Sequence, residues 1–164
     1  MIKGGAPHVL AMWQRQNPTR RADLDRFDRR EQAKYAFLRR LTKELNDAGV
    51  LLLLGTDASV SGLFPGKSAH VELRELVDAG LTPYEALTTG THNAGEFISR
   101  HVSSTELFGR VAPGQRADLI LVRGNPLINI DNISNIAGVM RRGRWLSSKE
   151  LERMREEVVV SYGR

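Results

Sequence analysis

The sequence predicts an α/β fold, and three features of the chain support this prediction. An apolar run over residues 50–54 lies between two glycines, which is typical of a strand buried on both faces. Such strands usually belong to parallel sheets covered by helices, and helical patterns flank this run at 19–48 and 68–99. From about residue 109 the pattern changes to short strands separated by turns.

Helices are expected on both sides of the apolar run. Over residues 19–48 apolar side chains recur with a period near 3.6, and the same pattern covers about 68–79. A further helix begins at residues 82–85, because Thr82 can cap it, a proline takes its first position and a glutamate completes a capping box. Shorter helices are expected at about 9–14 and 93–99.

The region 109–146 has a β pattern. A strand is expected at 117–122, and a hairpin at 136–146, where two apolar segments flank a tight Arg-Gly turn. A charged, solvated helix should follow, capped by Ser147 or Ser148 and running to about residue 157. These changes of pattern divide the chain into residues 1–108, 109–146 and 147–164.

Composition excludes several kinds of protein. The 164 residues contain no cysteine, so disulfides and thiolate catalysis are excluded. The chain has neither an apolar segment of about 18 residues nor a signal-peptide pattern, which predicts a cytoplasmic protein. The net charge is +5, but acidic residues alternate with arginines over 20–31, as on a solvated helix face. We therefore expect no nucleic-acid partner and no membrane partner.

Asp57 is the candidate that stands out by its position, because it closely follows the apolar run. A carboxylate just past the carboxyl end of a buried strand lies where α/β barrels place their chemistry. Alternatively, Asp57 caps the turn that follows, a common role for aspartate in loops. The residues alone leave both interpretations open.

Three segments, in this order, resemble the metal-dependent amidohydrolase superfamily, especially its imidazolonepropionase-like and prolidase-like members. The first is the apolar run that ends in Gly-Thr-Asp at 55–57. The others are 81–94 (LTPYEALTTGTHNA) and 109–121 (GRVAPGQRADLIL). Residues 93–95 (NAG) depart slightly from the usual Asn-Pro-Ala of the family. The closing hairpin at 136–146 also looks like the strand pair of these proteins.

This resemblance implies the C-terminal fragment of a (β/α)8 TIM barrel plus part of a small β-sandwich domain. A complete barrel has roughly 250 residues, so the chain is expected to be a portion of a larger enzyme and inactive alone. The parent would hydrolyse an amide or related C–N bond of a small-molecule or dipeptide-like substrate, with a divalent metal, usually zinc. Pairing with the missing N-terminal part, or a homo-oligomer, is expected.

The resemblance also assigns a double role to Asp57. The equivalent aspartate of the family binds the catalytic metal and accepts a proton from the attacking water, which it can return to the leaving amine. The family's other ligands are a His-x-His pair, a modified lysine or a glutamate, and further histidines. None is recognisable among the four histidines of this chain and their neighbours. The remaining ligands are therefore expected outside it.

His70 is a second candidate, for substrate binding, because it follows the loop after Asp57. A histidine at the start of a helix is more often solvated or capping. For His92 we favour a structural role, and His101 has no assigned function. Nothing local supports a substrate-side role for His8.

Two alternatives to an amidohydrolase portion remain. Residues 61–68 (SGLFPGKS) nearly match a phosphate-binding loop, in which backbone N–H groups wrap the phosphates and a lysine, here Lys67, neutralises them. However, Ser61 stands where the first glycine belongs, and no later strand ends in a magnesium-binding aspartate, so a nucleotide hydrolase is disfavoured. The other alternative is a non-catalytic assembly fragment whose exposed barrel edge pairs with another chain.

Overall fold

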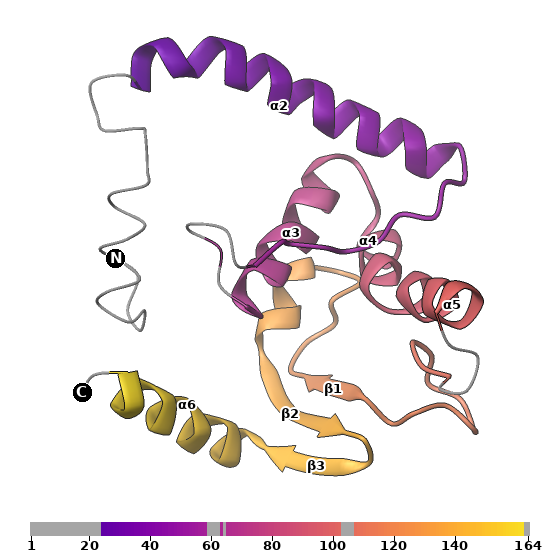
Figure 1. Ribbon diagram of the computed structural model, residues 1–164, viewed down its shortest axis with the longest axis vertical. Coiled ribbons are helices and arrows are strands. Elements are labelled where there is room, and N and C mark those ends of the chain that lie inside the picture. Colours follow the sequence, from indigo (N-terminus) through magenta and orange to yellow (C-terminus); the bar gives the residue numbers. More distant parts are fainter. Residues whose placement is uncertain (1–23, 59–62, 64, 103–106, 163–164) are drawn as a thin grey trace.

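The computed structural model of the protein describes residues 24–58, 63, 65–102 and 107–162. In this part of the chain a long helix is followed by a group of shorter helices and then by a small sheet (Figure 1). The elements are α2 (Leu24–Asp47), α3 (Lys67–Asp78), α4 (Pro83–Gly90), α5 (His92–His101), β1 (Leu119–Val122), η1 (Ile130–Ser134), β2 (Ile136–Arg141), β3 (Arg144–Ser147) and α6 (Ser148–Tyr162).

The helical half confirms the helices that the sequence predicts. Helix α2 takes up most of the expected 19–48 helix, and α3 and α5 match the two patterns that follow. Helix α4 begins with the predicted capping box: Thr82 Oγ1 accepts the N–H of Glu85, and Glu85 Oε2 accepts the N–H of Thr82 at 2.7 Å. The helix expected at 9–14 lies outside the described residues.

The β half is a three-stranded antiparallel sheet in the order β1-β2-β3. The predicted hairpin is confirmed, and its turn residues Arg142 and Gly143 have positive φ values of 48° and 80°, as a two-residue type I′ turn requires. Ser147 caps α6, because its Oγ accepts the N–H of Glu150 at 3.3 Å. The capped helix continues to Tyr162, beyond the predicted end.

A hydrophobic core joins the helical half to the β half. Leu73 of α3 and Ala86 of α4 pack with Ile130 and Ile133 of η1, and all four side chains are buried. No pattern in the sequence predicts η1, yet this short 3-10 helix carries the contact of the β half with the helices. A domain boundary at residue 108 stays a prediction.

The apolar run at 50–54 is extended, but it is not a strand of any sheet in the described structure, so the predicted strand buried on both faces is wrong for this chain. Leu52 and Leu54 are half-buried, whereas Leu51 and Leu53 are 40% and 41% exposed. The physical reason is that no described strand lies beside the run to supply ladder hydrogen bonds and cover its second face.

Helix α5 packs very closely against the chain that leads into the β half. A Cβ atom built on Gly95 would lie only 2.1 Å from the carbonyl oxygen of Phe108, so no side chain fits there. Glycine at position 95 thus fits the close contact between α5 and Phe108.

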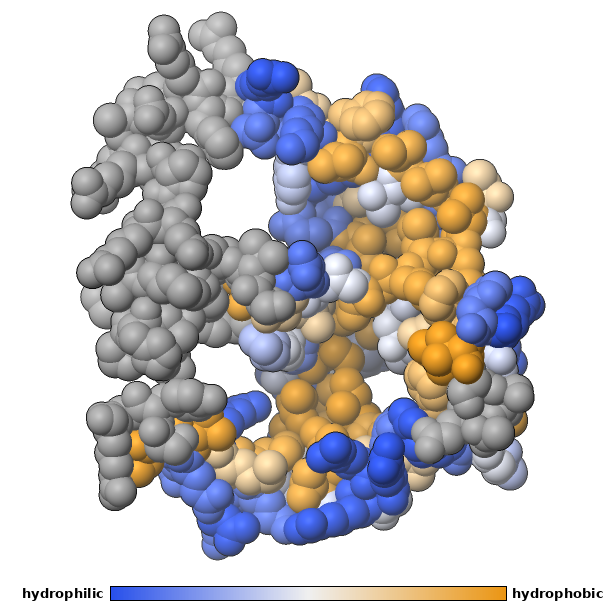
Figure 2. All heavy atoms as spheres, in the orientation of Figure 1, coloured by the Kyte–Doolittle hydropathy of each residue, from blue (hydrophilic) through white to orange (hydrophobic). Residues whose placement is uncertain are grey.

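Apolar residues remain exposed over the middle of the face drawn in Figure 2. Leu51 and Leu53 of the extended run contribute to the exposed apolar surface of the molecule, as do Ile120 and Leu121 of β1, which are 49% and 57% exposed. Among the described residues, β1 has a neighbouring strand on one side only, and the run at 50–54 has none on either side. Within the same residues, no helix is long and apolar enough to cross a membrane.

Candidate functional site

Asp57 lies at the end of the extended run, on its open side. From Leu51 to Ala58 exposure alternates, with the odd-numbered residues exposed and the even-numbered residues half-buried. Successive side chains of an extended chain point to opposite faces. Leu54 packs against the core, so its face is the one toward the helices. Asp57 therefore shares the opposite, open face with Leu51 and Leu53.

The backbone of Asp57 has an unusual conformation. Its φ of 50° falls in the left-handed region, which aspartate adopts more readily than most residues other than glycine. Such conformations are costly and cluster at functional sites, so this value supports a special role for the position. Among the described residues, the Asp57 carboxylate has no hydrogen-bond or ion-pair partner.

Three helices hold the extended run from its covered side. The N–H of Leu54 donates to the carbonyl of Thr89 in α4 at 3.2 Å. Asn93 of α5 donates from Nδ2 to the carbonyl of Leu52 at 2.9 Å. Glu72 of α3 accepts the N–H of Gly55 through Oε1 at 3.0 Å. No local sequence pattern signals this role of Glu72, because the contact joins residues 17 positions apart.

The structure places His70 in the contact between α3 and η1. Its Nδ1 lies 3.0 Å from Ser134 Oγ, and the side chain is half-buried. This hydrogen bond ties the helical half to the β half. Within the described part of the chain, no hydrogen bond joins His70 to Asp57. Substrate binding by His70 stays a prediction.

His92 and His101 make contacts of a structural kind. Arg110 donates from Nε to His92 Nδ1 at 3.0 Å, and Glu96 approaches the other ring nitrogen to 3.3 Å. These contacts link α5 to the segment after Phe108, in agreement with the structural role favoured for His92. The His101 ring packs on Phe97, with ring centroids 4.9 Å apart. His8 lies outside the described residues.

The segment that resembles a phosphate-binding loop is described only in part. Helix α3 begins at Lys67, after Gly66 with a φ of 79°, and no side chain caps it. The extended run before it belongs to no sheet, and residues 61, 62 and 64 are outside the described part. Of the features of a phosphate-binding loop, the described residues show only the exposed Lys67 and the start of α3.

Asp57 qualifies as one metal ligand and not as a complete metal site. Across residues 24–58, 63, 65–102 and 107–162, no group of three or more His, Asp or Glu side chains is placed to hold an ion. Catalytic zinc sites use three protein ligands and leave a further position open. A carboxylate on an open face, without a partner of its own, is chemically suited to be one of them.

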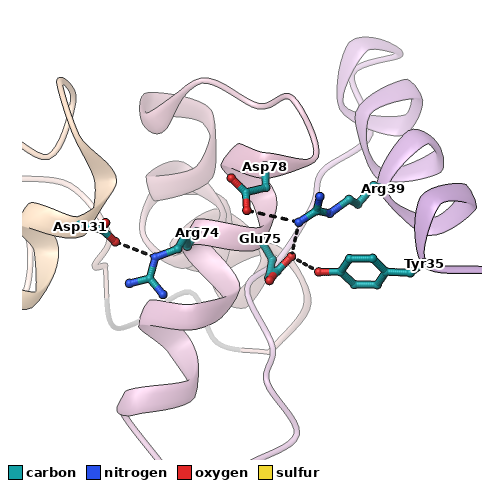
Figure 3. A network of polar contacts seen from close by, with 6 residues as sticks. All are labelled: Tyr35, Arg39, Arg74, Glu75, Asp78 and Asp131. Atoms are coloured by element: carbon teal, nitrogen blue, oxygen red, sulfur yellow. Dashed lines mark hydrogen bonds and ion pairs between the residues drawn. The ribbon is translucent and has the colours of Figure 1, made fainter. Parts of the chain in front are cut away.

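A network of polar contacts fixes α2, α3 and η1 relative to one another (Figure 3). Glu75 of α3 accepts hydrogen bonds from the Tyr35 hydroxyl and from Arg39 Nη2, the latter at 2.8 Å. These hydrogen bonds, first that from Tyr35 and then that from Arg39, lower the pKa of Glu75. On the other side of α3, Arg74 pairs with Asp131 of η1 at 2.6 Å. Helix α3, which binds Gly55 of the run, is thus linked to both α2 and η1.

These observations define an α/β protein with an exposed carboxylate at the end of an extended apolar segment. The profile of the amidohydrolase family matches residues 24–146, which is most of the chain. The chain belongs to the amidohydrolase family, as its motifs predicted.

Two relatives of known name are imidazolonepropionases. That of Geobacillus kaustophilus (strain HTA426) is 36% identical over 84 residues, which cover 48% of this chain and 18% of the relative. That of Streptomyces coelicolor (strain ATCC BAA-471 / A3(2) / M145) is 30% identical over 104 residues, which cover 62% of this chain and 25% of the relative. The chain thus spans no more than a quarter of the length of these two proteins.

Solved structures point to the same family. Bottromycin amidohydrolase is similar over 98% of this chain and 34% of its own, with 25% identity and a TM-score of 0.74. A Xaa-Pro dipeptidase with bound methionine in its active site is similar over 69% of this chain and 25% of its own, with 25% identity and a TM-score of 0.54. The matches imply an α/β fold of the TIM-barrel type.

Proposed function

We propose that the chain forms the C-terminal portion of a metal-dependent amidohydrolase. Residues 1–108 belong to its barrel, 109–146 are strands of a small β-sandwich, and 147–164 add a terminal helix. One observation carries the proposal: Asp57 lies on the face of the extended run that turns away from the helices. In a barrel with helices outside, that face lines the interior, and its carboxyl end is where active sites lie.

In this role Asp57 acts as metal ligand and as general base. A bound divalent metal lowers the pKa of water toward about 7 and thereby supplies a nucleophile at neutral pH. Asp57 would be one ligand of this metal, and its carboxylate would accept the proton as water attacks the carbonyl carbon of the amide. The same carboxyl group then donates this proton to the leaving nitrogen. Zinc is the usual metal of the family, and a single carboxylate does not select it over other divalent ions.

The substrate class follows from the family. The relatives include imidazolonepropionases and a Xaa-Pro dipeptidase. We therefore assign to the enzyme a small molecule or dipeptide-like compound with an amide or related C–N bond. The other ligands, and most of the loops that would shape substrate specificity, come from the rest of the barrel.

The test uses the protein expressed from its complete reading frame, assayed for bound zinc and for hydrolysis of imidazolone propionate and Xaa-Pro dipeptides. Asp57→Asn removes the charge but keeps a side chain that tolerates positive φ. It should lower kcat by about 100-fold or more and also reduce the zinc content. The matched control is Asp47→Asn, an exposed aspartate at the end of α2 that pairs with Lys43. It should leave both quantities unchanged.

Two outcomes would contradict the proposal. Full activity and full zinc content in Asp57→Asn would remove Asp57 from the site. A wild-type protein that forms stable oligomers but binds no metal and hydrolyses none of these compounds would favour the assembly fragment. The exposed Leu51 and Leu53 on the open face of the run are the observation that favours this second outcome, because they could pack against another chain.

A further inference from the structure

Glu72 connects the middle of α3 to the turn that presents Asp57. Its Oε1 accepts the N–H of Gly55 at 3.0 Å, two residues before Asp57. Its Oε2 is buried and has no hydrogen-bond partner among the described residues. The carboxylate therefore lies inside the contact between α3 and the end of the extended run. One of its oxygens accepts a hydrogen bond and the other accepts none from the described residues.

A buried acceptor without a donor is costly, and native proteins retain few of them. The hydrogen bond to the N–H of Gly55 is the polar contact that this carboxylate makes among the described residues. What the carboxylate does supply is a charged acceptor, which forms a stronger hydrogen bond to a backbone N–H than a neutral one does.

The position of this hydrogen bond matters because of the backbone that follows it. Asp57 has a φ of 50°, a sparsely populated conformation that the surrounding structure helps to maintain. Thr89 and Asn93 bind the run at Leu54 and at Leu52, upstream of Gly55. Among the described residues, Glu72 is thus the last tether before the turn.

We propose that Glu72 is the positioning residue for Asp57: through the N–H of Gly55 it fixes the turn that aims the Asp57 carboxylate at the open face. This inference rests on the proposed function of Asp57 as ligand and base. Glu72 touches neither metal nor substrate in this account. It acts only through the backbone of residues 55–57.

The experiment follows the Gly55 amide and the Asp57 carboxyl group by NMR in the complete 164-residue chain. In Glu72→Ala the Gly55 amide should exchange with solvent at least about tenfold faster, because its acceptor is lost, and the Asp57 carboxyl 13C resonance should shift. Glu72→Gln retains an acceptor oxygen and should restore both signals in part. The control is Glu75→Ala on the same helix, whose carboxylate binds α2 instead of the run. It should change neither signal.

Unchanged Gly55 exchange and an unchanged Asp57 resonance in Glu72→Ala would overturn the inference, as would the same changes in Glu75→Ala. If Glu72→Ala does not fold, Glu72→Asp decides. Its shorter side chain keeps the charge but withdraws the acceptor from the Gly55 N–H, so Gly55 exchange should again become faster, and unchanged exchange would overturn the inference.

Failure of the inference is distinguishable from failure of the proposed function. Suppose that Asp57→Asn loses zinc in the complete enzyme, but Glu72→Ala leaves the Gly55 and Asp57 signals unchanged. This pair of results contradicts only the role of Glu72. Asp57→Asn keeping zinc contradicts the function, whatever Glu72 does to Gly55. In the active enzyme, Glu72→Ala should lower kcat with little change in KM, since a misaimed base slows the reaction but leaves the substrate pocket intact.

Discussion

Two extended apolar segments of the chain have opposite surroundings. Strand β2 lies between β1 and β3, and its residue Val139 faces Ile120 on one side and Leu146 on the other. The run at 50–54 has the same kind of sequence but no strand beside it in the described structure. The difference teaches that an apolar pattern predicts an extended conformation. The hydrogen bonds of a sheet form only where the chain also supplies an adjacent strand.

The covered side and the open side of the run should therefore respond differently to mutation. On the covered side, side chains meet helices that are fixed by a core and by polar contacts. On the open side, side chains are exposed to solvent in this chain and would be covered only by strands of the proposed complete barrel.

Gly95→Ala should give the largest loss of stability. The new Cβ would lie 2.1 Å from the Phe108 carbonyl oxygen, so α5 or the following chain must move. We expect a loss of about 3 kcal/mol in the free energy of unfolding, measured by urea denaturation. The control Gly55→Ala adds a Cβ with nothing within 4 Å and should stay within about 0.5 kcal/mol. Equal losses for the two variants would contradict the packing described for α5.

Leu54→Ala and Leu53→Ala test the two faces of the run directly. Leu54 packs against the core, and its loss should cost about 2 kcal/mol. Leu53 is 41% exposed and should cost about 0.5 kcal/mol or less in this chain. In the complete enzyme the proposed barrel would cover Leu53, so Leu53→Ala should then become clearly destabilising. An equally small effect in both contexts would count against a strand beside the open face.

The helices and the hairpin were predictable because their signals are local. Thr82 and Glu85 stand three residues apart and form a capping box in the structure. The Arg142-Gly143 turn joins β2 to β3 with the two positive φ values that its shape requires. Asp57 could be singled out because it follows an apolar run, and the structure adds that it lies on the open face.

The features that could not be predicted depend on contacts between distant residues. Helix η1 contributes Ile130 and Ile133 to the core, but it is a short turn whose only local signal is Asn129, which accepts the N–H of Asp131 at 2.9 Å. The contact of Glu72 with Gly55 spans a loop and carries no pattern at all. The open face was missed because the apolar run by itself is typical of a strand with neighbours on both sides.

Thr82→Ala should have a moderate effect on the packed side. It removes the acceptor of the Glu85 N–H at the start of α4, which typically costs about 1 kcal/mol. The matched control Thr42→Ala removes a hydroxyl that donates to the Leu38 carbonyl within α2 and satisfies no orphan N–H. It should cost about 0.5 kcal/mol or less. Thermal unfolding of both variants measures the difference, and a larger effect at Thr42 would argue against the capping box as a determinant of α4.

Glu75 should give the smallest effect, and one that depends on pH. Hydrogen bonds from Tyr35 and Arg39 hold the pKa of Glu75 below its ordinary value of 4.5. The folded state therefore gains stability above about pH 4.5, and this gain is lost as the pH falls through the lowered pKa of the folded state.

Because 42% of the Glu75 side chain is exposed, the gain should stay below about 1 kcal/mol. Glu75→Gln should thus destabilise the chain at pH 7 and much less at about pH 3, as measured by urea denaturation. Glu44→Gln, whose carboxylate lies 3.5 Å from Arg40 on the solvent side of α2, is the control and should show little difference at either pH. A loss in Glu75→Gln that is the same at both pH values would mean that the ionised carboxylate does not clamp α2 to α3.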